Sequence, residues 1–353
     1  MPTSSLRFAT SRPIPMWLLL LLASVGAGLP RVHAVTLDMV TVGNAGNAND
    51  TTGYGGVGYS YQIAKYDVTI GQYTAFLNAV AATDTYSLYN TSMATDLNIA
   101  GISRAGSSGS YTYSVIGSAN RPITYVSWFD AARFANWMAN GQGSGSTETG
   151  AYTLVGGQTN GTAPAMNPGA TFSIPTENEW YKAAYYSPTL NSGSGGYYTY
   201  ATQSNMDPGN VIGSGSNQAN YYNGVFSVTQ SSSYDSNQNY LTDVGAFTNS
   251  PSFYGTFDQS GNVSQWNDLA GTAGSSRGLR GGYWFNNAVA LSSANRSTSD
   301  PSNEFVDVGF RLASPVPVPE PSTWVMGLAG IVGCGAWGAV RRRRASSACG
   351  KRS

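Results

Sequence analysis

The chain has 353 residues, of which 18 are basic and 18 acidic, so its formal net charge is zero. The balance is uneven, because residues 35–317 contain 9 basic and 17 acidic side chains. A net charge of −8 with scattered Lys and Arg excludes a nucleic-acid-binding surface, which requires clustered basic side chains. Only 10% of the residues are charged, whereas 41% are hydrophobic and 43 are glycine. This composition predicts a folded, loop-rich domain of an exported protein.

Cysteine and histidine are confined to the ends of the chain. The cysteines are Cys334 and Cys349, and the single histidine is His33. Residues 35–314 therefore cannot form a disulfide, a Cys or His zinc site, or a nucleophile activated by histidine. Chemistry in this region would depend on Asp, Glu, Lys, Arg, Tyr, Ser and backbone groups.

Residues 1–34 are typical of a secretory signal peptide. Arg7 and Arg12 precede the apolar run 16–29, and Val32-His33-Ala34 satisfies the small-residue rule for cleavage. A short membrane anchor is the alternative. We expect the mature chain to begin at Val35.

The C-terminal end has the composition of a membrane anchor. Residues 315–323 form a Pro-rich linker, residues 324–340 contain no charge, and the basic tail 341–353 begins with four arginines. The uncharged segment would measure about 26 Å as a helix, enough for a bilayer core of roughly 30 Å when the flanking arginines reach the interface. The sequence predicts a transmembrane helix at 324–340 with the tail in the cytoplasm, so that the exported chain is transiently anchored in the inner membrane.

Pro319, Glu320 and Pro321, followed by an apolar segment and an arginine cluster, closely resemble the PEP-CTERM sorting tails of Gram-negative bacteria. The resemblance implies recognition by an exosortase-type membrane protease, removal of the anchor and release to the envelope or the extracellular matrix. An ordinary single-span anchor is the alternative. A mass measurement of the mature C-terminus would distinguish the two, because only the anchor retains residues 324–340.

Residues 35–314 are predicted to form one α+β domain with few short helices, short strands and long loops. Helices are predicted after three capping residues, Thr69, Ser127 and Thr176, and the last two have Asp130 and Glu179 at capping-box spacing. Alternating aromatic runs bounded by Gly or Asn predict strands at 59–66, 111–116 and 197–202.

Six short strings occur in order through this domain, at 66–73, 122–131, 174–180, 261–266, 280–284 and 308–311. Together they resemble the formylglycine-generating enzyme, or sulfatase-modifying factor, family. The match covers essentially all of residues 35–314, although Ser173 stands where the family has its arginine and leucine lead-in. The resemblance implies a C-type-lectin-like fold. Most of these strings are explained by structure alone: Trp180 and Trp266 as core aromatics, and Arg311 as the partner of a buried carboxylate or carbonyls.

The resemblance also defines what chemistry to expect. Enzymes of the family oxidise a substrate cysteine with copper held by two cysteines shortly after the Arg-Gly-Gly string. Residues 285–296 contain no cysteine, and Cu(I) requires thiolates. A related iron-dependent branch uses histidine ligands, which this domain also lacks. We therefore expect no copper, zinc or iron and no oxidase activity, and keep the formylglycine-generating oxidase as the disfavoured alternative.

Calcium is the one cofactor that the composition allows, since it prefers carboxylate, amide and carbonyl oxygens. By resemblance, one calcium site would consist of Asp258, Gly261, Val263 and Gln265, where the family has glutamate in place of Gln265. A second would consist of Asn220, Tyr221 and Asp235. The alternative is that these residues only form turns.

Two non-enzymatic functions remain open. In the first, the stretch 283–305 binds an exopolysaccharide or another surface ligand, because aromatic and small polar side chains suit recognition. Its candidate contacts are Tyr283, Trp284, Asn286, Asn287, Asn295 and Arg296. In the second, the domain is a structural component of the biofilm matrix at the cell exterior, kept in solution by its acidic and polar surface.

Overall fold

The computed structural model of the chain describes residues 34–314. The predicted Pro-rich linker, the sorting motif, the apolar segment 324–340 and the basic tail lie outside the described residues, as does the signal peptide except for Ala34. Between residues 34 and 314, no helix is both long enough and apolar enough to cross a membrane.

The helices of the domain are short. The three longest are α1 (Ile70–Val80), α3 (Trp128–Ala139) and α4 (Glu177–Tyr185), and the single-turn helices are α2 (Ser92–Thr95), α5 (Leu190–Gly193) and α6 (Ala288–Leu291). All three predicted caps are confirmed, and each forms a complete capping box, pairing Thr69 with Gln72, Ser127 with Asp130 and Thr176 with Glu179. Each cap stabilises its helix by about 1 kcal/mol.

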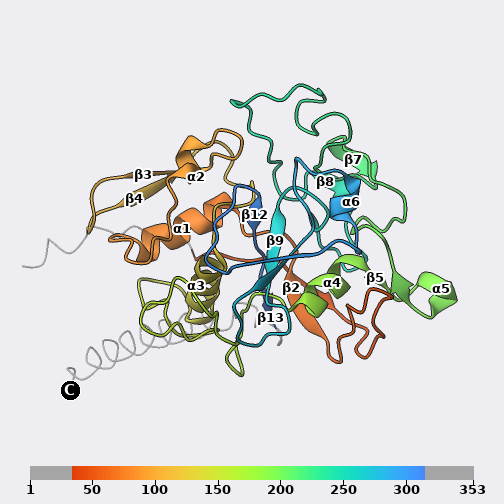
Figure 1. Cartoon of the computed structure of the whole chain (residues 1–353), viewed down its shortest axis with the longest axis horizontal. Coiled ribbons are helices and arrows are strands. Elements are labelled where there is room, and N and C mark those ends of the chain that lie inside the picture. The colour runs from red at the N-terminus through yellow and green to blue at the C-terminus, as the bar shows by residue number, and fades with distance from the viewer. Residues whose placement is uncertain (1–33, 315–353) are drawn as a thin grey trace, which may run out of the picture. The chain divides into compact units, whose positions relative to one another are not determined.

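Two sheets connect distant parts of the chain. The first has the order β1-β2-β13 and contains β1 (Met39–Val42), β2 (Tyr61–Ala64) and β13 (Ala313–Ser314). The second has the order β11-β10-β9-β12 and contains β9 (Ser264–Asn267), β10 (Arg277–Arg280), β11 (Ser297–Ser299) and β12 (Val308–Gly309). Figure 1 shows β9 at the centre of the described part, with α1 and α3 on one side and α4 on the other. The described domain is thus a mixed α and β fold.

Three two-stranded ladders complete the fold. They are formed by β3 (Ile102–Ala105) with β4 (Thr112–Val115), β5 (Tyr186–Ser187) with β6 (Gly196–Tyr197), and β7 (Gly213–Ser216) with β8 (Phe247–Asn249). The strands predicted at 59–66 and 111–116 are confirmed as β2 and β4. The strand predicted at 197–202 is wrong beyond Tyr197, because the backbone N–H of Tyr200 donates to the carbonyl of Ser204 and closes a turn there.

An aromatic core holds the helices to the central sheet. Phe76 of α1 packs against Phe134 of α3 with ring centroids 5.4 Å apart, and Phe134 lies 5.5 Å from Phe310 beside β12. The indole N–H of Trp266 in β9 donates to the carbonyl of Val126 at 2.9 Å. Each buried aromatic side chain contributes about 1.5–3 kcal/mol. These contacts fix the position of β9 relative to α3.

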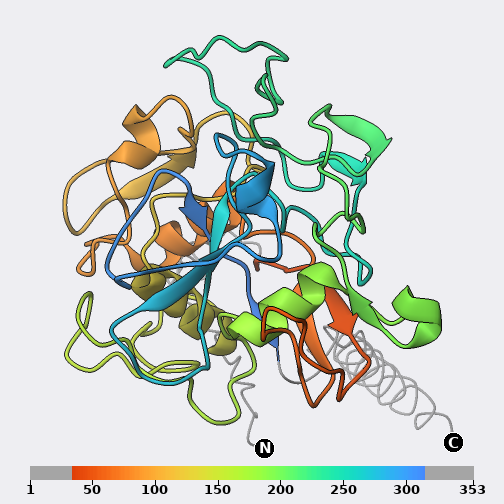
Figure 2. The same cartoon turned by 45° about the vertical axis from the view of Figure 1, so that its right-hand side comes forward.

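A buried arginine joins the two sheets, and it partners a carboxylate and carbonyls as the sequence predicts. Arg311 is fully buried and donates to Gln265 of β9 at 2.7 Å and to the carbonyl of Ala64 in β2 at 3.0 Å. It also pairs with the carboxylate of Asp67 at 3.1 Å. Next to this junction, α4 lies beside β2 in both views (Figures 1 and 2), and the hydroxyl of Tyr61 donates to the carbonyl of Glu179.

Candidate functional site

The candidate site lies where the chain leaves β10. Arg280, the last residue of this strand, is buried and donates from Nε to the carboxylate of Glu177 at 2.8 Å. Its Nη1 donates to the carbonyls of Ser293 at 3.0 Å and Asn295 at 2.9 Å. One guanidinium therefore fixes the strand end, the start of α4 and the segment that returns toward β11. This arrangement holds the backbone around residues 281–295.

A pocket of about 320 Å³ opens at this point. Its volume lies in the lower part of the range of small-molecule sites, about 300–1,000 Å³. The lining combines aromatic, amide, hydroxyl and carboxylate groups, supplied by Ser264, Leu279, Arg280, Gly282, Tyr283, Asn286, Ala290, Asn295, Ser297, Phe305, Asp307 and Val308. β9, β10, β11 and β12 all contribute, so the pocket is built by the central sheet and the segments that connect it.

Asp307 and Tyr283 supply the main polar groups of this pocket. Asp307 is half-buried, and its backbone carbonyl accepts from the N–H of Ser264 at 2.8 Å, which fixes its position before β12. Among residues 34–314, no cationic side chain forms an ion pair with it. Burial raises the pKa of Asp307. Burial also raises the pKa of Tyr283, and the charge of Asp307 adds to that shift.

Three of the six predicted ligand contacts, Tyr283, Asn286 and Asn295, line the pocket. Asn286 is oriented by the backbone N–H of Tyr283, which donates to its Oδ1 at 3.1 Å. Trp284 is buried and lies outside the lining, because its ring points into an aromatic cluster and stacks on Tyr240.

The other two predicted contacts are exposed but do not line the pocket. Asn287 is the residue before α6, at its N-cap position. Arg296 is engaged in a bidentate pair with Glu177, with both hydrogen bonds 2.8 Å long. Of the six predicted contacts, only Tyr283, Asn286 and Asn295 therefore belong to the pocket.

Four polar lining residues were not among the predicted contacts: Arg280, Asp307, Ser297 and Ser264. Asp307 directly precedes the string 308–311 that carries the family resemblance, and this adjacency is the signal that could have pointed to it. Ser297 and Ser264 are the first residues of β11 and β9, and nothing in their local sequence marks them as pocket residues.

In the first predicted calcium set, the side-chain oxygen of Gln265 is already engaged by hydrogen-bond donors and is not free to bind a cation. The side-chain oxygen of Gln265 accepts from Trp180 and from Arg311, each at 2.7 Å. Its nitrogen donates to the carbonyl of Asp258 at 2.8 Å, and Oδ2 of Asp258 accepts from the N–H of Gly245. A fully buried guanidinium thus occupies the position next to this oxygen. The donor set at Gln265 does not fit a calcium ion.

The other residues predicted to bind calcium, two from the first set and all three from the second, make separate contacts. Gly261, at a φ of +86°, lets the carbonyl of Asn220 approach so closely that a Cβ would collide with it. The side chain of Asn220 donates to the carbonyl of Tyr240, whereas the backbone of Asp235 donates to the hydroxyl at the far end of the same tyrosine. Val263 is buried in an aromatic cluster, and the hydroxyl of Tyr221 donates to the carbonyl of Pro208. Calcium binding at the second set stays a prediction.

Comparison with protein families identifies both parts of the sequence. The family described as "Sulfatase-modifying factor enzyme 1-like domain" matches residues 48–316, and the PEP-CTERM protein-sorting motif matches residues 317–344. The second match contains Pro319, Glu320 and Pro321. It supports export to the cell envelope or extracellular space and implies processing by an exosortase at the membrane. No curated protein matches the chain.

Three solved structures are similar to the chain at low sequence identity. Treponema denticola variable protein 1 is 20% identical, with a TM-score of 0.48, over 81% of this chain and 97% of its own. The protein CarF is 21% identical, with a TM-score of 0.43, over 80% and 99% of the two chains. PvdO from Pseudomonas aeruginosa is 18% identical, with a TM-score of 0.41, over 79% and 94%. The family match spans most of the chain, and the chain therefore belongs to the family of sulfatase-modifying factor enzyme 1-like domains.

Proposed function

We propose that the chain is an exported, non-catalytic binding protein whose ligand pocket lies beside Arg280 and Tyr283, and that its ligand is a glycan of the cell exterior. The single observation that carries this proposal is a carboxylate and a hydroxyl of the pocket lining that no other residue engages. The carboxylate of Asp307 accepts only from its own backbone N–H, and neither it nor the hydroxyl of Tyr283 has a hydrogen-bond partner on another described residue.

The chemistry of the lining favours a polyhydroxylated ligand. Asp307 can accept hydrogen bonds from hydroxyl groups, while Asn286 and Asn295 offer amide donors and acceptors. Phe305, which is 37% exposed, provides an apolar wall. Aromatic and small amide side chains of this kind give contact area and adaptable hydrogen bonds at low entropic cost.

The same pocket supports no oxidase mechanism. In the family, copper is held by two cysteines in the stretch that here spans residues 285–296, and this stretch contains neither cysteine nor histidine. Residues 34–314 also present no group of three or more His, Cys, Asp or Glu side chains placed to hold a metal ion. The residues of this chain can bind and orient a ligand, but they supply no soft donor for Cu(I).

A glycan array with the full-length chain tests the binding function. We expect retention of at least one glycan, and weaker binding after Asp307→Asn and Tyr283→Phe, because each change removes one polar group from the lining. Asp300→Asn is the matched control, since Asp300 is exposed and does not line the pocket. An array that retains nothing would contradict the proposal and favour a structural role in the extracellular matrix.

A separate assay tests the absence of oxidase activity. The full-length chain is incubated with Cu(I), oxygen and a cysteine-containing peptide, and the peptide mass is followed. We expect no loss of thiol above the rate with copper alone. Stoichiometric copper in the purified protein, together with turnover of the peptide, would overturn the non-catalytic assignment.

A further inference from the structure

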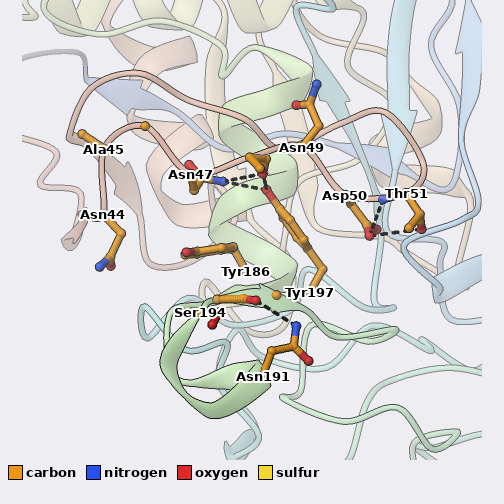
Figure 3. A pocket seen from close by; sticks show the side chains of 14 residues that line it. Asn44, Ala45, Asn47, Asn49, Asp50, Thr51, Tyr186, Asn191, Ser194 and Tyr197 are labelled. Atoms are coloured by element: carbon orange, nitrogen blue, oxygen red, sulfur yellow. Dashed lines mark hydrogen bonds between the residues drawn. The ribbon is translucent and has the colours of Figure 1, made fainter.

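A second pocket, of about 660 Å³, lies between the loop of residues 44–51 and the turn that joins β5 to β6 (Figure 3). It shares no lining residue with the pocket at Tyr283. Its volume falls within the range of small-molecule sites, about 300–1,000 Å³. The sequence motifs described above do not include this region, although residues 43–58 are rich in Asn and Gly.

The loop 44–51 is held in place by contacts from three directions. The backbone N–H of Gly46 donates to the carbonyl of Val57 at 2.8 Å, which closes the loop. The ammonium group of Lys182 in α4 donates to the carbonyl of Asn44 at 2.9 Å. The amide of Asn47 donates to the hydroxyl of Tyr197 in β6 at 2.6 Å, and Figure 3 shows Tyr197 crossing between the loop and the turn. A ligand would therefore not need to order this loop, which lowers the entropic cost of binding.

Several polar groups on the pocket wall have no partner. The side-chain nitrogens of Asn44 and Asn49 donate no hydrogen bond to any described residue, although their oxygens accept from Tyr254 and from the N–H of Gly56. The side-chain oxygen of Asn191 and the hydroxyl of Ser194 are equally free among the described residues. In Figure 3, Asn44 and Asn49 lie on the loop side of the pocket, and Asn191 and Ser194 lie on the turn side. Free donors on the loop thus lie opposite free groups on the turn.

The free polar groups of the pocket are uncharged. Asp50 is the one lining residue with an ionisable carboxylate, and its Oδ1 already accepts from the N–H of Thr51 at 2.7 Å. Its Oδ2 accepts from the hydroxyls of Tyr181 and Thr52. A cation would find this carboxylate saturated, and an anion would be repelled by it. The electrostatics therefore favour a neutral ligand.

Two tyrosine rings supply apolar surface. Tyr186 and Tyr197 pack edge to face with ring centroids 5.1 Å apart at an interplanar angle of 63°. Gly195 lies against Tyr186 at the edge of the pocket. It has a φ of +81°, and a Cβ there would collide with the hydroxyl of Tyr186. Because glycine has no side chain, it leaves the edges of the tyrosine rings at the pocket surface.

We propose that this pocket binds a neutral saccharide, at a site separate from the pocket at Tyr283. A sugar ring offers hydroxyl groups that both donate and accept, which matches the free amides and hydroxyl of the wall. Its C–H groups form an apolar face that can lie against a tyrosine ring. The inference does not depend on the ligand of the first pocket, because the two linings are disjoint.

The test uses the full-length chain and calorimetric titration with a panel of neutral hexasaccharides built on glucose, mannose, galactose, xylose and N-acetylglucosamine. Ala45→Trp places an indole in the pocket from an exposed lining position. Asn49→Ala removes one free amide nitrogen together with the oxygen that accepts from the N–H of Gly56. Ser114→Trp is the matched control, at an exposed position of β4 that lines neither pocket. Ser297→Trp blocks the first pocket from an exposed lining position. Unfolding midpoints in urea verify that each variant folds.

We expect at least one hexasaccharide to lose about tenfold or more in affinity with Ala45→Trp, and a smaller amount with Asn49→Ala. The same ligand should bind Ser114→Trp and Ser297→Trp as it binds the wild type. Binding by no member of the panel, or equal binding by Ala45→Trp and the wild type, overturns this inference. Binding lost with Ser297→Trp alone would support the first pocket and reject the second.

Discussion

Glu177 holds Arg296 with both of its carboxylate oxygens, through two hydrogen bonds of 2.8 Å each. The same carboxylate accepts from Arg280, also at 2.8 Å. Arg280 ends β10 and Arg296 directly precedes β11, so one buried residue of α4 fixes both ends of the loop 281–295. This loop carries Tyr283, Asn286 and Asn295 of the pocket. The helix that begins at Glu177 therefore determines the shape of a site to which it contributes no lining residue.

Replacing Glu177 should destabilise the domain through this pair of arginines. Glu177→Gln keeps the size of the side chain but leaves the buried Arg280 without a counter-charge. Removing one partner of a buried ion pair costs about 3–5 kcal/mol. Arg296→Gln should cost about 1 kcal/mol or less, because the side chain of Arg296 is 35% exposed. Urea unfolding of both variants checks that Glu177→Gln loses more stability than Arg296→Gln. Equal midpoints for Glu177→Gln and the wild type would contradict this prediction.

Substitutions at the neighbouring residues Tyr283 and Trp284 should have different effects: the first should weaken ligand binding, and the second should lower the stability of the domain. Trp284 stacks on Tyr240 with ring centroids 4.6 Å apart and an interplanar angle of 9°, and it is buried. We expect Trp284→Ala to lower the free energy of unfolding by about 3–5 kcal/mol. Tyr283→Phe should change that free energy by no more than about 0.5 kcal/mol, because its hydroxyl has no partner among the described residues, yet it should weaken ligand binding. Loss of stability in Tyr283→Phe equal to that in Trp284→Ala would refute the distinction.

Local sequence was sufficient to predict the helix starts but not the site. The three capping boxes depend on residues three positions apart, so their spacing is visible without a structure. The pocket depends on contacts such as Glu177 with Arg280, which are 103 residues apart. Strands of two to four residues, as in β12 and β9, are too short to show an alternating pattern.

Only three of the six predicted ligand residues line the pocket, for a related reason. Residues 283–296 contain three aromatic and three amide side chains, and composition alone does not show which of them face the pocket. The direction of each side chain is decided by tertiary contacts: Trp284 by the ring of Tyr240, and Arg296 by Glu177. Asp307 enters the pocket because β12 pairs with β9, which is distant in sequence.

The domain should be more stable at mildly acidic pH than at neutral pH through Asp130. Burial raises the pKa of this carboxyl to about 7, and the charge of Glu304 adds to the shift, while hydrogen bonds from Ser127 and the charge of Arg133 oppose it. The unfolded chain has the ordinary value near 3.9. Between about pH 4 and pH 7 the folded state retains a proton that the unfolded state has released. The contribution of Asp130 to stability is therefore greatest below pH 4 and is lost as the pH rises toward 7.

Asp130→Asn removes this titration and keeps an oxygen that can accept from the N–H of Ser127. The free energy of unfolding of the wild type should fall relative to that of the variant by up to about 1.4 kcal/mol for each pH unit in this window. Asp300→Asn is the control, since Asp300 is fully exposed. Urea unfolding at several pH values provides the measurement, and parallel pH profiles for wild type and Asp130→Asn would show that the carboxyl does not titrate in this range.

The first predicted calcium set, which contains Asp258 and Gln265, should not stabilise the domain through calcium. Any ion bound to the folded state alone raises the melting midpoint by mass action. However, the side chain of Gln265 already contacts Arg311, Trp180 and the carbonyl of Asp258, and Asn220 and Asp235 contact opposite ends of Tyr240. We expect Asp258→Asn to leave any difference between the midpoints in millimolar calcium and in EDTA unchanged, measured by circular dichroism. A rise in calcium that Asp258→Asn abolishes would instead establish the first set, and a rise that Asp235→Asn abolishes would establish the second.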